Sequence, residues 1–144
     1  MIGMIITGHG EFAPGIAHAL EMTAGKQDFM LAVPFMDGQD LSEFEQSLLV
    51  SASKLKGSVE GVVFFTDMLG GTPFRSSMLA SAQTENSAVV VGSNLPMLIE
   101  MALTRGGFDN AKELAAAAKQ AGLSSIDAPE LPSGHKEETD EGGI

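Results

Sequence analysis

The sequence predicts an α/β fold, in which a doubly wound and mostly parallel sheet of strand order 2-1-3-4 carries helices on both faces. Three observations support this prediction. Four short apolar runs are nearly continuous rather than alternating, which is typical of strands covered on both faces. A helical pattern of apolar residues follows each run, and this alternation indicates parallel strands joined by right-handed crossovers. The length of 144 residues is that of one ordinary domain.

The first half of the chain contains two strand–helix pairs. The apolar run Ile2–Thr7 predicts the first strand, and residues 13–24 keep one apolar face and predict the helix that follows. The run Phe29–Phe35 predicts the second strand. Residues 41–55 place apolar side chains three or four positions apart, and they predict the second helix.

The second half repeats this alternation. Apolar runs at Gly61–Thr66 and Ala88–Val91 predict the third and fourth strands. Helices are expected over residues 74–82 and 95–103, where apolar residues again recur at helical spacing. A fifth, alanine-rich helix is expected over residues 109–121.

The C-terminal residues follow neither pattern. Leu123–Asp127 predicts a short edge strand, and prolines, glycines and acidic residues come after it. We therefore expect one domain over residues 1–128 and an acidic, disordered tail over residues 129–144.

The composition excludes several classes of protein. The absence of cysteine rules out a disulfide scaffold, a thiol nucleophile and any metal site built on thiolates. The net charge of −11 argues against binding to nucleic acid or to an anionic membrane. No segment resembles a signal peptide or a membrane span, so a cytoplasmic location is expected. No histidines and acidic residues cluster at metal-ligand spacing, and neither a metal nor a cofactor is expected.

A histidine and an aspartate are expected at the carboxyl ends of two neighbouring strands. His9 follows the first strand between Gly8 and Gly10, and Asp67 follows the third. Ligands of open α/β sheets bind at this edge, where the strand order reverses. An imidazole is a nucleophile near neutral pH, and an adjacent carboxylate fixes its tautomer and stabilises its cation. We interpret the pair as catalytic, the alternatives being an ordinary loop histidine and a capping aspartate.

The segment Gly70–Phe74 predicts a helix start that can hold an anion. Thr72 suits the N-cap, and Pro73 suits the first helical position. The two glycines before them expose backbone N–H groups, which attract a phosphoryl group together with the helix dipole. The alternative is a well-formed turn without a ligand.

Large apolar residues also follow the strands near the predicted crevice. They are Phe35, Met36 and Met68. Such residues predict an adaptable rim for docking another protein, with core packing as the alternative.

Three motifs taken together resemble one family, the IIA component of the mannose-type sugar phosphotransferase system. The motifs are G-H-G after the first strand, D-x-x-G-G-[ST]-P-F after the third and G-x-N-x-P-M-L after the fourth. They lie within Thr7–Gly10, Phe64–Phe74 and Gly92–Glu100. The resemblance extends over roughly residues 1–122, with the elements in the same order.

The resemblance implies a phosphotransferase that works through a phosphohistidine. His9 would accept a phosphoryl group on Nε2 from the phosphorylated histidine phosphocarrier protein and pass it to a IIB component. Asp67 would hydrogen-bond the other ring nitrogen. Gly71, Thr72 and Phe74 would match the helix start near the phosphoryl group.

The resemblance also implies partners. The family forms a homodimer in which a C-terminal strand, here Leu123–Asp127, crosses to the partner's sheet. Some relatives continue into a fused IIB domain, whereas this sequence ends in an acidic tail, so IIB is expected on a separate polypeptide. That polypeptide would in turn be coupled to membrane IIC and IID components.

Two hypotheses from other classes stay open. One is a regulatory module that keeps the fold and is phosphorylated, but does not donate onward. The other is a nucleotide- or flavin-binding domain, because residues 8–13 match G-x-G-x-x-[GA]. A histidine between the two glycines would crowd a pyrophosphate, and no acidic residue ends the second strand at the expected spacing, so this match is weak.

Overall fold

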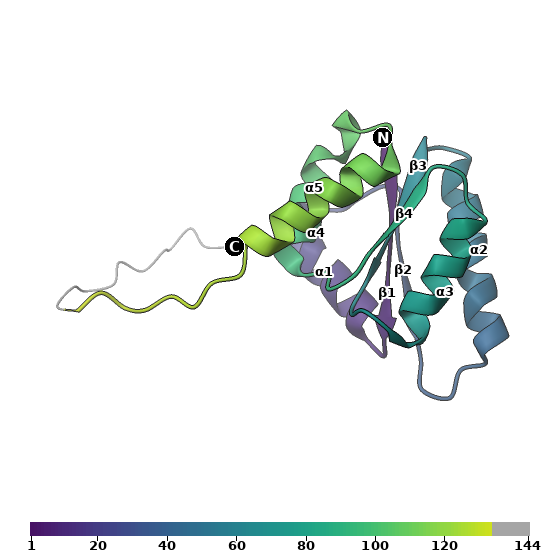
Figure 1. Cartoon of the computed structure of the whole chain (residues 1–144), viewed down its shortest axis with the longest axis horizontal. Coiled ribbons are helices and arrows are strands. Elements are labelled where there is room, and N and C mark those ends of the chain that lie inside the picture. The colour runs from purple at the N-terminus through teal and green to yellow at the C-terminus, as the bar shows by residue number, and fades with distance from the viewer. Residues whose placement is uncertain (134–144) are drawn as a thin grey trace.

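A computed structural model describes residues 1–133 of the chain. Its centre is a parallel sheet of order β2-β1-β3-β4, as the sequence predicts (Figure 1). The strands are β1 (Ile2–His9), β2 (Met30–Phe35), β3 (Gly61–Thr66) and β4 (Ser87–Val90). Both central strands, β1 and β3, are buried nearly throughout, which explains their continuous apolar runs.

Helices cover both faces of the sheet, again as predicted. They are α1 (Phe12–Ala24), α2 (Leu41–Lys56), α3 (Gly71–Ala82), α4 (Leu95–Thr104) and α5 (Ala111–Ser124), with a short 3₁₀ helix over Arg105–Gly107. Figure 1 shows α1, α4 and α5 on one side of the sheet and α2 and α3 on the other. Alternate residues of β1 therefore enter two separate cores: Ile2, Met4 and Ile6 pack on the first side and Ile5 on the second.

Most of the boundaries differ from the sequence prediction by one to three residues, and three of the differences have a clear physical reason or bear on the site. β1 continues to His9, because its pairing with β2 extends to the register pair His9–Phe35. β2 begins one residue later than predicted, at Met30, because Phe29 has a φ of 55° and is not extended, although its carbonyl still accepts the N–H of Met4 in β1. α3 begins at Gly71 with Gly70 as N-cap, so the N-cap predicted at Thr72 is wrong.

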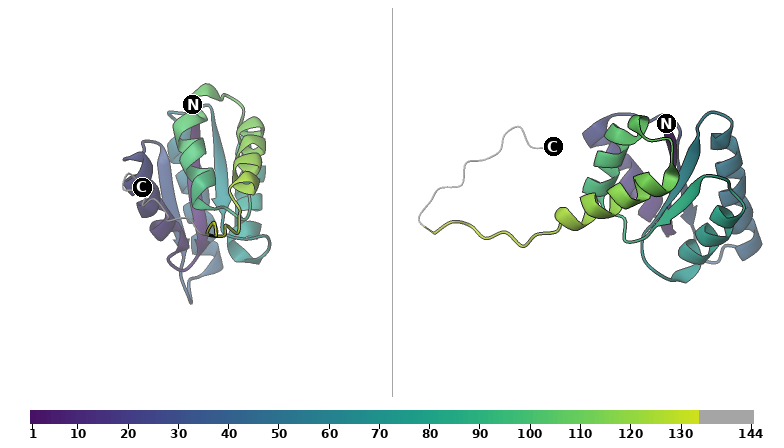
Figure 2. Two further views of the ribbon diagram at one scale, coloured as in Figure 1. Left: turned by 90° about the vertical axis from the view of Figure 1, so that its left-hand side faces the viewer. Right: turned by 45° about the horizontal axis from the view of Figure 1, so that its top comes forward.

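The edge strand predicted at Leu123–Asp127 is not formed within this chain. Leu123 and Ser124 instead complete the last turn of α5, where the Ser124 hydroxyl donates to the carbonyl of Gln120 at 2.8 Å. The residues after α5 lead away from the body, so no strand of the same sheet lies beside them (Figures 1 and 2). Of the predicted tail, residues 134–144 lie outside the described part of the chain.

The described helices include none that is both long and apolar enough to cross a membrane.

Candidate functional site

His9 lies at the carboxyl edge of the sheet and projects a partly exposed imidazole. It is the last residue of β1, and its side chain is 47% exposed. The chain turns away directly afterwards, because Gly10 has a φ of 56°, which favours glycine. The N–H of Gly10 donates to the carbonyl of Phe35 at 2.8 Å and holds this turn against β2.

Asp67 directly follows β3 and holds His9 through one carboxylate oxygen. Its Oδ2 lies 2.7 Å from Nδ1 of the imidazole and accepts the backbone N–H of His9 at 2.9 Å. Its Oδ1 accepts the N–H of Met68 at 2.9 Å. The structure thus brings together the two residues that the sequence predicts to face each other across neighbouring strands.

The surroundings of Asp67 keep its carboxyl group ionised. Burial raises the pKa of Asp67, but hydrogen bonds from the backbone and the ring of His9, and from the N–H of Met68, outweigh this effect. The net result is a pKa below the ordinary value of 3.8. An ionised carboxylate can only accept a hydrogen bond from Nδ1–H, so the neutral imidazole carries its hydrogen on Nδ1 and its lone pair on Nε2.

The other ring nitrogen, Nε2, lies beside the start of α3. A Cβ atom on Gly71 would lie 3.1 Å from Nε2 and 3.0 Å from Cε1 of His9. Gly71 also has a φ of 81°. Both this backbone conformation and the limited space beside His9 therefore favour glycine at this position. Thr72 and Phe74 lie in the same first helical turn, and Phe74 is half-buried.

The helices that begin beside His9 lack a side-chain cap, unlike the other three α-helices. Asp40, Asn94 and Asn110 accept N–H groups at the starts of α2, α4 and α5. Neither α1 nor α3 has such a bond at its N-terminus. The first N–H groups of a helix have no partner within the helix, so the start of α3 offers free donors to an anion next to Nε2.

Apolar side chains border the site. Met36 and Met68, two of the three residues predicted for a docking rim, are exposed. Leu69, which is 69% exposed, extends this rim and was not predicted, although it directly follows Met68 in the sequence. Phe35 is half-buried and lies edge-to-face with the His9 ring, with centroids 6.2 Å apart and an interplanar angle of 77°.

Within residues 1–133, no three histidine, aspartate or glutamate side chains gather in a way that could hold a metal ion. An imidazole with a free Nε2 and a carboxylate on Nδ1 can bond covalently to an anionic group through Nε2, and the uncapped N–H groups nearby can hold that anion.

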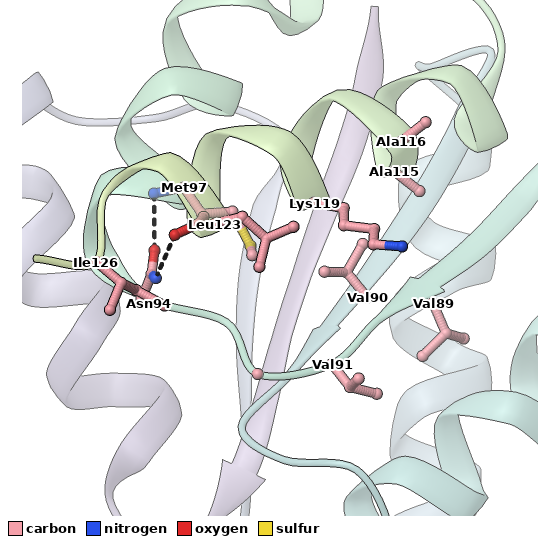
Figure 3. Close-up of a pocket in the computed structure, with 12 residues that line it drawn as sticks. Val89, Val90, Val91, Asn94, Met97, Ala115, Ala116, Lys119, Leu123 and Ile126 are labelled. Carbon is pink, nitrogen blue, oxygen red and sulfur yellow. Dashed lines mark hydrogen bonds between the residues drawn. The ribbon is translucent and has the colours of Figure 1, made fainter.

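A second feature, separate from His9, is an apolar groove of about 610 Å³ along the outer edge of β4. Val90, Met97 and Leu123 line it from β4, α4 and α5, and Lys119 reaches across it from α5 (Figure 3). Asn94 lies at one end of the groove, where its side chain accepts the N–H of Met97 and donates to the carbonyl of Gly122 (Figure 3). Edge strands usually contain a proline, a charged residue or a bulge that prevents pairing with another strand. The edge strand β2 contains Pro34, whereas β4 consists of Ser, Ala and two Val and contains no such residue.

Comparison with known proteins gives one consistent family. Residues 3–119 match the family model EIIA-man, described as PTS system fructose IIA component. The chain is 30% identical over 101 residues to the PTS system fructose-specific EIIA component of Bacillus subtilis (strain 168), which is 70% of this chain and 68% of that protein. It is 28% identical over 127 residues to the PTS system mannose-specific EIIAB component of Escherichia coli (strain K12). That match covers 88% of this chain but 39% of the longer E. coli protein.

A solved structure shares the architecture as well. The mannose/sorbose specific IIA subunit of the phosphotransferase system from Enterococcus faecalis superposes with a TM-score of 0.79. The sequences are 30% identical, and the match covers 91% of this chain and 96% of that one.

Proposed function

The chain belongs to the EIIA-man family of mannose-type phosphotransferase-system IIA components, and from this premise we propose that His9 carries the phosphoryl group. The family places the protein among phosphotransferases of sugar transport. In our proposal, His9 accepts the group from the phosphorylated histidine phosphocarrier protein and passes it to a IIB component. The observation that carries this assignment is the 2.7 Å contact between Nδ1 and Asp67, which leaves Nε2 as the free nitrogen.

The accepting step exchanges one phosphorus–nitrogen bond for another. The lone pair of Nε2 attacks phosphorus, the bond to the donor imidazole breaks, and the donor nitrogen keeps the electron pair. Phosphorylation makes the His9 ring cationic, and the carboxylate of Asp67 stabilises that charge through Nδ1–H. Donation to IIB reverses the step, with a nucleophile of IIB attacking the same phosphorus atom.

The start of α3 supplies the anion-holding part of the proposal. Gly71 lies against Nε2, and Thr72 and Phe74 occupy the same turn, so a phosphoryl group on Nε2 would meet the uncapped end of the helix. Transfer of this kind depends mainly on positioning and on electrostatic stabilisation of the phosphoryl oxygens. Backbone N–H groups and a helix dipole provide both without a metal ion.

We propose that both protein partners dock on the rim around His9. Met36, Met68 and Leu69 offer adaptable apolar contacts, and Phe35 lies just inside them. The net charge of −11 favours partners with a basic docking face. Membrane IIC and IID components would be reached only through IIB.

We further propose that the chain is a homodimer in which Leu123–Asp127 of each copy covers the β4 edge of the other. The groove beside β4 is apolar, and that edge has no blocking residue. Ile126 is 72% exposed at one end of the groove of its own chain (Figure 3), and the residues that follow lead away from the body (Figure 2). We keep residue 128 as the end of the domain, and residues 129–144 as a tail. Because its relay partners are proteins of the cytoplasm, we place the protein there.

The relay is tested with purified proteins. Phosphoenolpyruvate, Enzyme I and the histidine phosphocarrier protein should add one acid-labile phosphate, seen by intact mass spectrometry. His9→Ala should lose it completely, whereas His18→Ala, which alters an exposed histidine of α1, should keep it. Phosphate on His9→Ala would refute the assignment of His9. Phosphorylation without transfer to any IIB component would identify a regulatory module instead.

The dimer is tested by its mass in solution. Ile126→Asp should convert a dimer into a monomer in sedimentation experiments. Leu103→Asp, at a similarly exposed position on α4, should leave the dimer intact. A wild-type monomer would refute the proposed exchange of segments.

A further inference from the structure

We propose that Phe35 is a positioning residue that fixes the His9 imidazole for phosphoryl transfer; this inference rests on the function proposed above. Phe35 and His9 are in-register partners at the ends of β2 and β1. Register partners of adjacent strands project to the same face of a sheet, so the two side chains emerge together. They do so on the α2 and α3 side, where Ile5 and Val33 belong to the buried core.

The ring of Phe35 is itself held by the core. Its centroid lies 4.8 Å from that of Phe44, at an interplanar angle of 55°. Phe44 belongs to α2 and is fully buried. The imidazole thus stands at the exposed end of a row of three rings, His9, Phe35 and Phe44, whose other end cannot move without disturbing the core.

The backbone beneath this row is also fixed. Gly10 donates to the carbonyl of Phe35 at 2.8 Å, directly after His9. Two residues earlier in each strand, the buried Thr7 hydroxyl donates to the carbonyl of Val33 at 2.6 Å. Phe35 therefore has a defined position relative to His9, both through its ring and through its main chain.

The Phe35 ring restrains the His9 imidazole at a second point, in addition to the hydrogen bond from Asp67. Asp67 holds Nδ1, but the His9 side chain is 47% exposed, so one hydrogen bond has to orient a largely open ring. Phe35 limits the tilt of that ring and keeps Nε2 beside Gly71. Displacement of a reacting atom by about 1 Å can cost a hundredfold in rate, so a side chain that only restrains the ring affects transfer.

The test compares two phosphoryl donors. The phosphorylated histidine phosphocarrier protein must dock, whereas phosphoramidate is small and releases ammonia as its phosphorus–nitrogen bond breaks and the bond to Nε2 forms. Phe35→Leu should lower the rate constant by about tenfold to a hundredfold with both donors, while KM for the protein donor stays within about twofold. Phe35→Tyr keeps the ring and should restore the rate.

A spectroscopic measurement separates positioning from general loss of packing. Nitrogen-15 NMR of His9 should show a single tautomer, with hydrogen on Nδ1, in the wild type and in Phe35→Tyr. Phe35→Leu should show a mixture of tautomers. Phe108→Leu removes a half-buried ring at the other end of the sheet and should change neither the tautomer nor the rate. Phe35→Met takes the place of Phe35→Leu if that variant does not fold.

Three outcomes would overturn the proposal. Unchanged rates and tautomer in Phe35→Leu would remove Phe35 from the site. An increase in KM for the protein donor alone, with phosphoramidate unaffected, would assign Phe35 to docking. If wild-type protein accepts no phosphate, the proposed function fails, and an unchanged tautomer in Phe35→Leu would then refute the positioning role separately.

Discussion

His9 at the carboxyl end of the sheet and Arg105 at the amino end are two ionisable side chains in opposite environments. At the carboxyl end, His9 is 47% exposed and its ring has a single hydrogen-bond partner. At the amino end, Arg105 is 2% exposed and its guanidinium donates to four oxygen atoms. A group that reacts needs an open atom, whereas a buried charge needs hydrogen-bond partners, which both terminal nitrogens of Arg105 find although its Nε has none among the described residues. The comparison indicates that His9 is placed to meet a ligand, whereas Arg105 is placed to stabilise the fold.

Arg105 holds together the loop between α1 and β2. Its two terminal nitrogens donate to the side-chain oxygen of Gln27 and to the carbonyls of Asp28, Phe29 and Ile2. Burial lowers the pKa of Arg105, and the charge of Asp28 acts in the opposite direction. The guanidinium nevertheless stays charged, because arginine keeps its proton at all physiological pH values.

The largest expected effect on stability comes from Arg105→Met. Methionine fills a similar volume but leaves the part-buried carbonyl of Asp28 and the side-chain oxygen of Gln27 without the donor that Arg105 supplies, and it should lower the free energy of unfolding by about 3 kcal/mol. His9→Ala, at the exposed end, removes one hydrogen bond to the Asp67 carboxylate and should lower it by less, about 1 kcal/mol. Urea denaturation of both variants measures the difference. Equal losses would show that the two ends do not differ as described.

Asp67→Asn should have the largest effect on activity short of removing His9. The amide still accepts a hydrogen bond from Nδ1, but it lacks the charge that stabilises a cationic ring. Phosphoryl acceptance should slow by about a hundredfold or more, measured by rapid quench with the phosphorylated carrier protein. Glu113→Gln, an exposed acid near the start of α5 at the opposite end of the sheet, is the matched control. A wild-type rate in Asp67→Asn would exclude Asp67 from the mechanism.

Gly71→Ala and Gly25→Ala compare the two ends at similar φ angles. These are 81° and 82°, which side chains other than glycine rarely adopt, so alanine costs about 1–3 kcal/mol of stability at either position. At Gly25 the added methyl group meets open space, whereas at Gly71 it would lie 3.1 Å from Nε2 of His9. Only Gly71→Ala should therefore slow phosphorylation, by about tenfold or more. Equal rates in the two variants would mean that the approach to Nε2 does not pass Gly71.

The same comparison shows what the sequence could predict. The order of strands and helices follows from apolar periodicity, and the pairing of His9 with Asp67 follows from parallel neighbours whose carboxyl ends meet at one edge. Both depend on local patterns and on the handedness of crossovers. Arg105, in contrast, satisfies carbonyls up to 103 residues away, and an isolated arginine in a sequence carries no sign of that burial.

The exact ends of the helices could not be predicted from the sequence either. Thr72 and Pro73 fit an ordinary helix start, but Gly70 and Gly71 adopt positive φ angles and begin the helix earlier. Leu123–Asp127 contains residues that suit a strand, yet its first two residues continue α5. A helix end depends on which backbone groups find partners, and tertiary contacts decide this more strongly than propensity does.

The smallest expected effect is a pH dependence at the carboxyl end. The pKa of Asp67 lies below 3.8 in the folded protein, so its ionised form contributes stability at neutral pH. That contribution is fully present above the unfolded value and is lost as pH falls through the lower, folded value. The wild type should therefore be more stable than Asp67→Asn at pH 7, and the difference should close only below pH 3.8. Arg105→Met, at the other end, should be less stable than the wild type at every pH in this range, because arginine itself does not titrate there. Thermal denaturation of the three proteins between pH 7 and about pH 3 measures both slopes. A gap between wild type and Asp67→Asn that closes well above pH 3.8 would show that His9 and Met68 do not hold the carboxylate in its ionised form.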